Sequence, residues 1–378
     1  MIRLLIAAGI LSISTSFVGF FGFGETGFSD VDDYGFVLHE NAAHLTLIDL
    51  SKDKLAGRIE TPFAVSDLEV LRDDNTLIAA GTEDNRLAFI DIAEPEAMEF
   101  LKIPFVPGDL LLSPDAVTLA VAAINTGEIA LIDLKNRRVH SVIEGASGSV
   151  QITFANGSDY LFVPDGASGE VRVIDVYGGY EVDPIAVSLT AASEPLSSVT
   201  RTPNGLFGVV VDPAASEAAL INFRSWRQDR ILPTGRMPTR PYITADGRFM
   251  MIANQADRTI DVISTDYFET AARLPGLSDI VSVSTGYFET VAFVVSQSER
   301  KAVIVDLEAL EAGGEIVFSG TPGPAVGDAD GLRIYVPIRE TGEIVVIGTQ
   351  SREILSRIPT ATDAPVRVHL ARTNNYCH

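Results

Sequence analysis

Cysteine is almost absent from this 378-residue sequence, and the single residue of this type, Cys377, is next to last. One cysteine cannot form an internal disulfide, and it excludes both a CxxC zinc site and a CxxCH haem attachment. Long apolar runs are equally scarce after the N-terminal region, where no segment approaches the roughly 18 residues of a membrane span. Helical periodicity is nearly missing too, because its best stretch, Asp306 to Ala312, is too short to matter for the fold.

Positive charge is also in short supply. The chain has 28 Lys and Arg residues against 51 Asp and Glu, which gives a formal net charge of −23. A surface this acidic repels phosphate backbones and anionic lipid headgroups, so nucleic acid is not expected as a partner. The charge itself is typical of a highly soluble protein. Apolar residues make up 46% of the chain, which is enough to bury a large core and excludes a disordered protein.

The first 24 residues have the pattern of an export signal. Arg3 provides one positive charge, Leu4–Leu11 form the apolar centre, and no further charge follows until Glu25. Candidate cleavage positions follow at the small residues Ser12, Ser14 and Ser16. The alternative is an uncleaved N-terminal anchor, because the apolar stretch is long enough to span, although glycines weaken it. We therefore expect a periplasmic, secreted or cell-surface protein that contacts a membrane only if this segment is retained.

A repeat organises the rest of the chain. A short apolar phrase ends at Asp49, Asp91, Asp133 and Asp175, and returns in altered form at Asn222, Ser264, Asp306 and Gly348. The intervals between these landmark residues are 42 residues, except for a fourth interval of 47. Each unit contains four short apolar segments separated by turn residues, as at Ser113-Pro114-Asp115 and Asn125-Thr126-Gly127. Four-stranded units of this length, repeated radially, are typical of the blades of a β-propeller.

Eight landmark phrases predict an eight-bladed β-propeller, a single all-β domain from residue 32 to residue 370. The first unit lacks an innermost strand and begins with Tyr34–Glu40, which matches a second strand. After the last full unit, Ala364–Leu370 has the pattern of an innermost strand. We therefore expect this C-terminal strand to pair into the first blade and close the ring, leaving residues 371–378 as a tail.

The phrase SPDAVTLAVA at Ser113–Ala122, followed by a tight turn and a strand that ends in Ile-Asp, resembles the YVTN-type β-propeller repeat. The resemblance covers essentially the whole chain after residue 33, and it implies the architecture rather than an activity. Propellers of this kind include surface-layer and periplasmic proteins, lactonases, amine-dehydrogenase large subunits and haem d1-binding domains. The chain departs from the pattern at an insertion, Ala191–Pro195, and at Asn222-Phe223-Arg224, which replaces the usual Ile-Asp and small turn residue.

One residue per blade stands at the predicted start of the innermost strand, 24 residues before the landmark of its unit except for Arg367, which stands on the C-terminal strand. In a propeller these positions crowd around one mouth of the channel, where ligands commonly bind. This predicted ring consists of Asp67, Asp109, Gln151, Ser198, Arg240, Ser282, Pro324 and Arg367. Arg240 and Arg367 are candidates to hold a small anionic ligand, because planar guanidinium groups suit carboxylates. The alternative is that these polar side chains satisfy one another across a wet channel.

Histidines cluster in the predicted first blade, where His39 and His44 flank a turn and His369 lies on the strand beside them. Three imidazoles could bind a divalent metal, and His369 with Arg367 and Arg240 could hold a haem d1. Chance clustering of cross-strand neighbours is the alternative, so no cofactor is favoured. Cys377 and His378 form a weaker metal-binding candidate in what we expect to be a mobile tail.

No catalytic signature appears: the sequence lacks a G-x-S-x-G elbow, HExxH, Walker A and a Rossmann glycine pattern. No catalytic residue is therefore nominated. The sequence favours an exported, non-enzymatic propeller that binds a partner protein or a small polar or anionic ligand at its channel face. Two alternatives stay open, a redox or cofactor propeller built on His369 and a lactonase-like metal-dependent hydrolase. The hydrolase would need a carboxylate cluster such as Asp67 and Asp109 at the channel.

Overall fold

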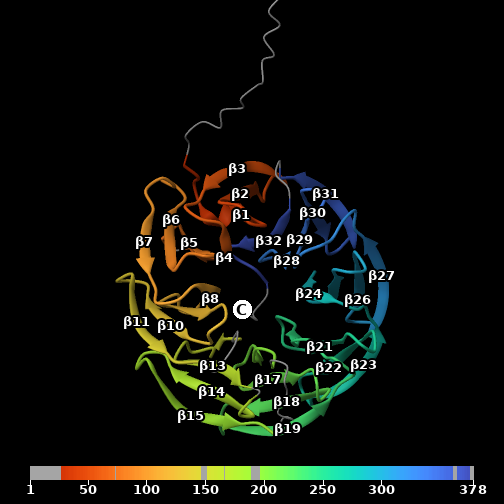
Figure 1. The fold of residues 1–378 in the computed structure, drawn as a ribbon. Helices are drawn as coiled ribbons and strands as arrows, with labels where there is room; N and C mark the ends of the chain where they lie inside the picture. Colours follow the sequence, from red (N-terminus) through yellow and green to blue (C-terminus); the bar gives the residue numbers. More distant parts are fainter. Residues whose placement is uncertain are drawn as a thin grey trace, which may run out of the picture.

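The computed structural model describes residues 27–72, 74–145, 151–165, 167–188, 196–360 and 364–374. In these segments the chain forms eight four-stranded antiparallel sheets that follow one another around a ring (Figure 1). One short 3-10 helix, η1 (Val31–Asp33), is the only helical element of the described part. The predicted eight-bladed β-propeller is therefore confirmed.

The strands of the first four blades have the following bounds. Blade 1 contains β1 (Tyr34–His39), β2 (His44–Asp49), β3 (Lys54–Glu60) and β32 (Pro365–Leu370). Blade 2 contains β4 (Val65–Leu71), β5 (Thr76–Gly81), β6 (Arg86–Asp91) and β7 (Glu99–Lys102). Blade 3 contains β8 (Pro107–Leu112), β9 (Thr118–Ala123), β10 (Ile129–Asp133) and β11 (Arg138–Ile143). Blade 4 contains β12 (Thr153–Phe154), β13 (Tyr160–Asp165), β14 (Glu170–Asp175) and β15 (Tyr180–Ala186).

The other four blades repeat the same order, with the innermost strand first. Blade 5 contains β16 (Thr200–Arg201), β17 (Phe207–Asp212), β18 (Glu217–Asn222) and β19 (Arg227–Pro233). Blade 6 contains β20 (Tyr242–Ile243), β21 (Phe249–Asn254), β22 (Thr259–Ser264) and β23 (Glu269–Pro275). Blade 7 contains β24 (Ile280–Gly286), β25 (Val291–Ser296), β26 (Lys301–Asp306) and β27 (Glu311–Val317). Blade 8 contains β28 (Val326–Gly327), β29 (Arg333–Ile338), β30 (Glu343–Gly348) and β31 (Glu353–Pro359).

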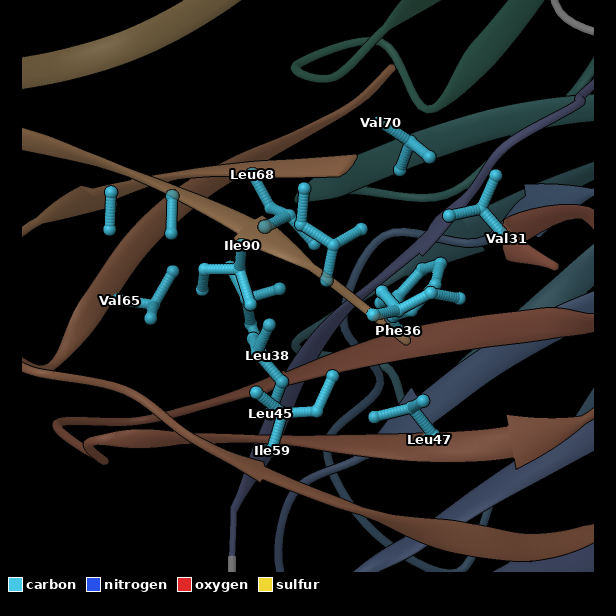
Figure 2. Close-up of a cluster of buried hydrophobic side chains, with 14 residues drawn as sticks. Val31, Phe36, Leu38, Leu45, Leu47, Ile59, Val65, Leu68, Val70 and Ile90 are labelled. Carbon is cyan, nitrogen blue, oxygen red and sulfur yellow. The ribbon is translucent and has the colours of Figure 1, made fainter. Parts of the chain in front are cut away.

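The apolar core lies between neighbouring blades rather than inside any one of them. Phe36 and Leu47 of blade 1 pack with Leu68 and Ile90 of blade 2, and all four are fully buried (Figure 2). Both faces of a middle strand are covered by adjacent blades, so β5 is buried at every position. This explains why the landmark phrases are almost continuously apolar. Burying a Leu or Phe side chain contributes about 1.5–3 kcal/mol, so a blade that loses a neighbour loses much of its stability.

Ring closure depends on β32, which pairs antiparallel with β1. In the register of this pair Phe36 faces His369, Val37 faces Val368 and Leu38 faces Arg367. The predicted strands Tyr34–Glu40 and Ala364–Leu370 each lose only one terminal residue in the structure. The predicted closure of the first blade by the C-terminal strand is therefore confirmed, and it removes the open sheet edges that an incomplete ring would expose.

Beyond β32, the chain runs toward the centre of the ring (Figure 1). Asn374 is 8% exposed, and its Nδ2 donates a hydrogen bond to the carbonyl oxygen of Thr285 at 2.6 Å. Arg372 forms an ion pair with Asp32 at 2.7 Å. Residues 371–374 of the predicted tail are thus anchored to the propeller, and Cys377 and His378 lie outside the described residues.

The predicted export signal, residues 1–24, also lies outside the described residues. Among the helices that the structure does describe, none has the length and apolar character needed to cross a membrane.

Candidate functional site

The innermost strand of each blade has one edge that faces the channel instead of another strand. Backbone groups on such an edge need hydrogen-bond partners, and several obtain them from the innermost strand of the preceding blade. Such bonds run from Leu110 N to Asp67 Oδ2 (2.8 Å), from Leu112 N to Glu69 Oε1 (3.3 Å), from Thr200 Oγ1 to the Pro241 carbonyl (2.8 Å) and from Ala325 N to Ser282 Oγ (2.9 Å). Asp67 and Ser282 of the predicted ring therefore act as links between blades.

Ring closure builds a charged cluster around Asp67. Nη1 of Arg367 lies 2.9 Å from Oδ1 of Asp67, and Nε2 of His369 lies 3.7 Å from the same oxygen. Asp67 and Arg367 are 300 residues apart in the sequence and meet because β32 and β4 are the innermost strands of adjacent blades. The Asp67 side chain is 8% exposed, whereas that of Arg367 is 43% exposed. The carboxylate of the cluster is thus buried, while the side chain of Arg367 remains partly accessible.

Burial controls the protonation of the carboxyl groups in this cluster. It raises the pKa of Asp67, while the charge of Arg367 and the hydrogen bond from Leu110 N act in the opposite direction. Burial and the neighbouring charge of Asp67 raise the pKa of Glu69 to about 8. Glu69 is therefore mostly protonated and neutral at pH 7, and its carboxyl group can donate a hydrogen bond.

The other members of the predicted ring stand on different blades. Asp109 is exposed on β8, where its charge raises the pKa of Asp67. Gln151 and Arg240 are exposed in the segments before β12 and β20. Ser198 is buried, and within the described residues its Oγ has no hydrogen-bond partner. The structure thus gathers Asp67, Arg367 and His369, together with Asp109, and distributes the remaining positions around the channel.

The histidines of blade 1 do not form one group. His39 and His44 stack with ring centroids 4.9 Å apart, and His39 Nε2 is hydrogen-bonded to Thr46 Oγ1 at 2.8 Å. Both rings are buried, and burial lowers the pKa of His44. His369 lies instead beside Asp67. Within the part of the chain that the structure describes, no group of three His, Cys, Asp or Glu side chains could hold a metal ion.

The sequence analysis missed Glu69, although a signal for it was present. It lies two residues beyond Asp67 on β4, and so 22 residues before its landmark. Thr200 and Ser284 hold the same position in their own units, and both bond to a carbonyl of the next blade. A second set of positions, two residues further along each innermost strand, includes all three of these residues.

A second missed residue, Glu289, lies where the innermost strands end, at the opposite end of the channel. Its carboxylate accepts hydrogen bonds from Ala245 N at 2.7 Å, Thr285 Oγ1 at 2.6 Å and Asn374 Nδ2 at 3.4 Å. Burial raises the pKa of Glu289. A cavity of about 190 Å³ adjoins Glu289 and Asn374. The C-terminal segment is therefore held at this end by the Thr285 carbonyl and by the buried Glu289 carboxylate.

The turn that presents Glu289 departs from the repeat. Blades 5, 6 and 8 carry Pro-Asn-Gly or Ala-Asp-Gly here, whereas this unit has Tyr287, Phe288 and Glu289, all with left-handed φ (44°, 57° and 59°). Three consecutive non-glycine residues in this region are strained. A Cβ at Gly327 of the next blade would lie 2.5 Å from Asn374 Oδ1, so glycine at that position makes room for the C-terminal segment.

The comparisons with known proteins agree with the fold. No protein-family model matches the chain, so the YVTN-type resemblance is not confirmed, and no curated protein is similar enough in sequence to count as a relative. A solved structure of dihydro-heme d1 dehydrogenase NirN in complex with DHE is similar over 91% of this chain and 76% of its own, with a TM-score of 0.74 and 16% identity.

Two further solved structures are similar. A functionally unknown protein from Desulfotomaculum acetoxidans DSM 771 has a TM-score of 0.61 and 12% identity, and covers 90% of this chain and 99% of its own. Kuenenia stuttgartiensis hydrazine synthase has a TM-score of 0.55 and 15% identity, and covers 79% of this chain and 96% of its own. At these identities the similarity establishes the propeller fold alone.

Proposed function

We propose that this protein is a binding propeller that holds a small anionic or polar ligand at the channel mouth where the innermost strands begin, without catalysing a reaction. The observation that carries the proposal is the half-exposed guanidinium of Arg367, which ring closure places in the channel wall beside Asp67. A guanidinium has five N–H donors; Nη1 of Arg367 donates to Asp67, and the exposed part of the side chain can donate to a ligand.

The surroundings of Arg367 define the ligand class. The backbone N–H of Leu110 fixes Asp67, and Asp67 in turn orients the guanidinium, which favours bidentate binding of a carboxylate. Neutral Glu69 adds a hydrogen-bond donor, while the charge of Asp109 opposes a second anionic group. The cluster therefore suits a molecule with one carboxylate and further hydroxyl or amino groups, such as a hydroxy acid or an amino acid.

Calorimetric titration with lactate, succinate and glycerol tests this assignment. We expect lactate to bind more tightly than succinate, and glycerol not to bind. The double variant Asp67→Asn/Arg367→Gln removes the guanidinium without leaving a buried charge unpaired, and should weaken lactate binding by at least about tenfold. Asp67→Asn alone retains Arg367 and is the matched control. Equal lactate affinity in the double variant and the control would refute the proposal.

A cofactor-binding propeller is the second candidate, because His369 lies beside Arg367 in the channel wall and a similar propeller, NirN, was solved with DHE bound. The position of His369 does not suit an axial haem ligand. Nε2 of His369 is buried and lies 3.7 Å from Asp67 Oδ1, so this nitrogen is not presented to an iron. An absorption spectrum and metal analysis of protein from its native source separate the candidates, since a visible band that His369→Ala abolishes would replace the first proposal with the second.

We also propose that the protein is exported with residues 1–24 removed, as the N-terminal pattern predicts. The intact mass of protein from its native source tests this. A mass that includes residues 1–16 would show that the segment is retained and would favour an N-terminal anchor.

A further inference from the structure

A second cavity lies away from the channel, between blades 4 and 5. Its volume is about 230 Å³. Four aromatic side chains line it, and Asn156 and Asp159 contribute polar groups. The aromatic residues are Tyr160, Phe162, Phe223 and Trp226. Phe223 belongs to the segment where the sequence departs from the repeat, so the cavity coincides with a local change in the unit.

The aromatic rings form two contacting pairs. Phe162 and Phe223 stack with centroids 4.6 Å apart and an interplanar angle of 6°. Tyr160 and Trp226 meet edge to face, with centroids 4.9 Å apart. Phe162 is fully buried, whereas Trp226 is 38% exposed. The cavity is therefore lined by a buried ring, Phe162, and by a partly exposed ring, Trp226. The faces of such rings carry negative partial charge.

The equivalent groove between blades 2 and 3 shows how the chain itself fills this kind of space. Arg137 directly precedes β11, as Trp226 directly precedes β19, and both have left-handed φ (47° and 53°). The Arg137 guanidinium lies 4.9 Å from the centroid of Phe89 on the preceding blade. In this groove, a cation from the turn covers an aromatic ring.

The groove between blades 5 and 6 is filled in another way. The residue in the same turn position, Phe268, is 6% exposed and packs against Phe207 with centroids 5.1 Å apart. Between blades 4 and 5, by contrast, aromatic rings line a cavity, and the turn residue Trp226 stays partly exposed.

We propose that this cavity binds a small organic cation, such as a quaternary ammonium group, against its aromatic rings, as the Arg137 guanidinium lies against Phe89 between blades 2 and 3. Aromatic faces attract such cations, and the Asp159 carboxylate complements their charge. None of the nine described residues that line the cavity is cationic. The nearby Arg201 is bound through Nη1 to Asn156 Oδ1 at 2.7 Å. The net charge of −23 further favours cations near the surface.

Trp226 is the only tryptophan in the chain, so its fluorescence reports directly on the cavity. We expect titration with tetramethylammonium chloride to change the emission saturably, with a midpoint in the millimolar range that weak cation–π binding produces. Sodium chloride at equal ionic strength should give no saturable change, and neither should the neutral near-isostere 3,3-dimethyl-1-butanol, whose tert-butyl group has the shape of a trimethylammonium group. An equal response to the isostere would show an apolar site and overturn the proposal, as would no saturable response to tetramethylammonium.

Three variants locate the binding. Asp159→Asn and Tyr160→Leu keep the fluorophore and should each weaken binding by about threefold to tenfold. Tyr177→Leu, at an exposed aromatic residue in the corresponding turn of blade 4, is the matched control and should bind like the unmodified protein. Glucose serves as a neutral test ligand, and saturable binding of glucose in place of tetramethylammonium would assign the cavity to a sugar and refute the cation. Undiminished binding in both Asp159→Asn and Tyr160→Leu would place the cation elsewhere.

Discussion

Two sides of the channel wall link their blades with different chemistry. Between blades 2 and 3, the carboxyl groups of Asp67 and Glu69 accept hydrogen bonds from the backbone of β8. Between blades 7 and 8, the hydroxyl groups of Ser282 and Ser284 bond to the backbone of Ala325. Both arrangements satisfy the free edge of an innermost strand. Only the first buries a charge, and a buried charge needs a counter-ion.

The counter-ion Arg367 determines whether the charged links between blades can also bind a ligand. Arg367 reaches Asp67 only when β32 completes blade 1, so one ion pair both secures the closure and places a guanidinium in the channel wall. The hydroxyl side needs no counter-ion and offers a ligand only weak neutral contacts. The difference shows how one structural position becomes a candidate site through a change of side chain.

Deletion of residues 364–378 should have the largest effect. It removes β32, exposes an edge of β1, and leaves Asp67 without Arg367. It also opens the apolar cluster in which Val368 packs between blades 1 and 8. We expect the cooperative thermal transition, followed by circular dichroism, to disappear. A truncated protein that melts like the full chain would show that closure does not stabilise the ring.

Arg367→Gln should have the next largest effect. The substitution leaves a buried carboxylate without its cation, and we expect a loss of about 2–3 kcal/mol in the free energy of unfolding. This is less than for a fully buried pair because Arg367 is half-exposed. Urea unfolding measures it. A loss no larger than that of Ser282→Ala would remove the distinction between the two sides.

Glu69→Gln should change how stability depends on pH. The pKa of Glu69 is raised to about 8 in the folded protein, whereas an unfolded glutamate titrates near about 4.3. Between these values the folded state holds a proton that the unfolded chain has lost, so the contribution of Glu69 is present at acid pH and lost as the pH rises toward 8.

Urea unfolding of the Glu69→Gln variant at pH 5, 7 and 9 checks this expectation. The decline in stability with rising pH should be smaller than in the unmodified protein, because glutamine does not titrate. The matched control Glu353→Gln, at an exposed glutamate, should keep the original decline. If the Glu69 variant and the control show the same decline, Glu69 is not the group that holds the proton.

Ser282→Ala should have the smallest effect. It removes one neutral hydrogen bond, from Ala325 N, and we expect a loss of about 1 kcal/mol. Urea unfolding beside Arg367→Gln gives the comparison directly. A loss above about 3 kcal/mol would mean that the hydroxyl links between blades 7 and 8 contribute as much to the free energy of unfolding as the ion pair beside blade 2.

The repeat made the fold predictable. Burial on both faces keeps the middle strands apolar, so the landmark phrases recur visibly, and the phrases that end at Asp49, Asp91 and Asp133 end where β2, β6 and β10 end. Closure was predictable because the first unit lacked an innermost strand and the chain supplied one at its end. Strand ends moved by a residue or two, since turn geometry rather than the apolar pattern fixes them.

The site was only partly predictable. The repeat offset identified Asp67 as a ring member, and the C-terminal strand identified Arg367, but their contact depends on which blades adjoin and how far the side chains reach. Glu289 and Asn374 meet only because the chain beyond β32 crosses the ring. The cavity at Trp226 depends on neighbouring aromatic side chains that the repeat does not specify. Contacts of this kind follow from the three-dimensional arrangement, which the period of the sequence does not encode.

A double-mutant cycle on Asp67 and Arg367 tests most directly whether closure of the ring builds and holds the charged cluster. The free energies of unfolding of the unmodified protein, Asp67→Asn, Arg367→Gln and the double variant are measured in urea. We predict that the double variant loses less stability than the sum of the single losses, with a coupling of about 2 kcal/mol. Losses that add to within about 0.5 kcal/mol would contradict the account, because the two side chains would then not depend on each other.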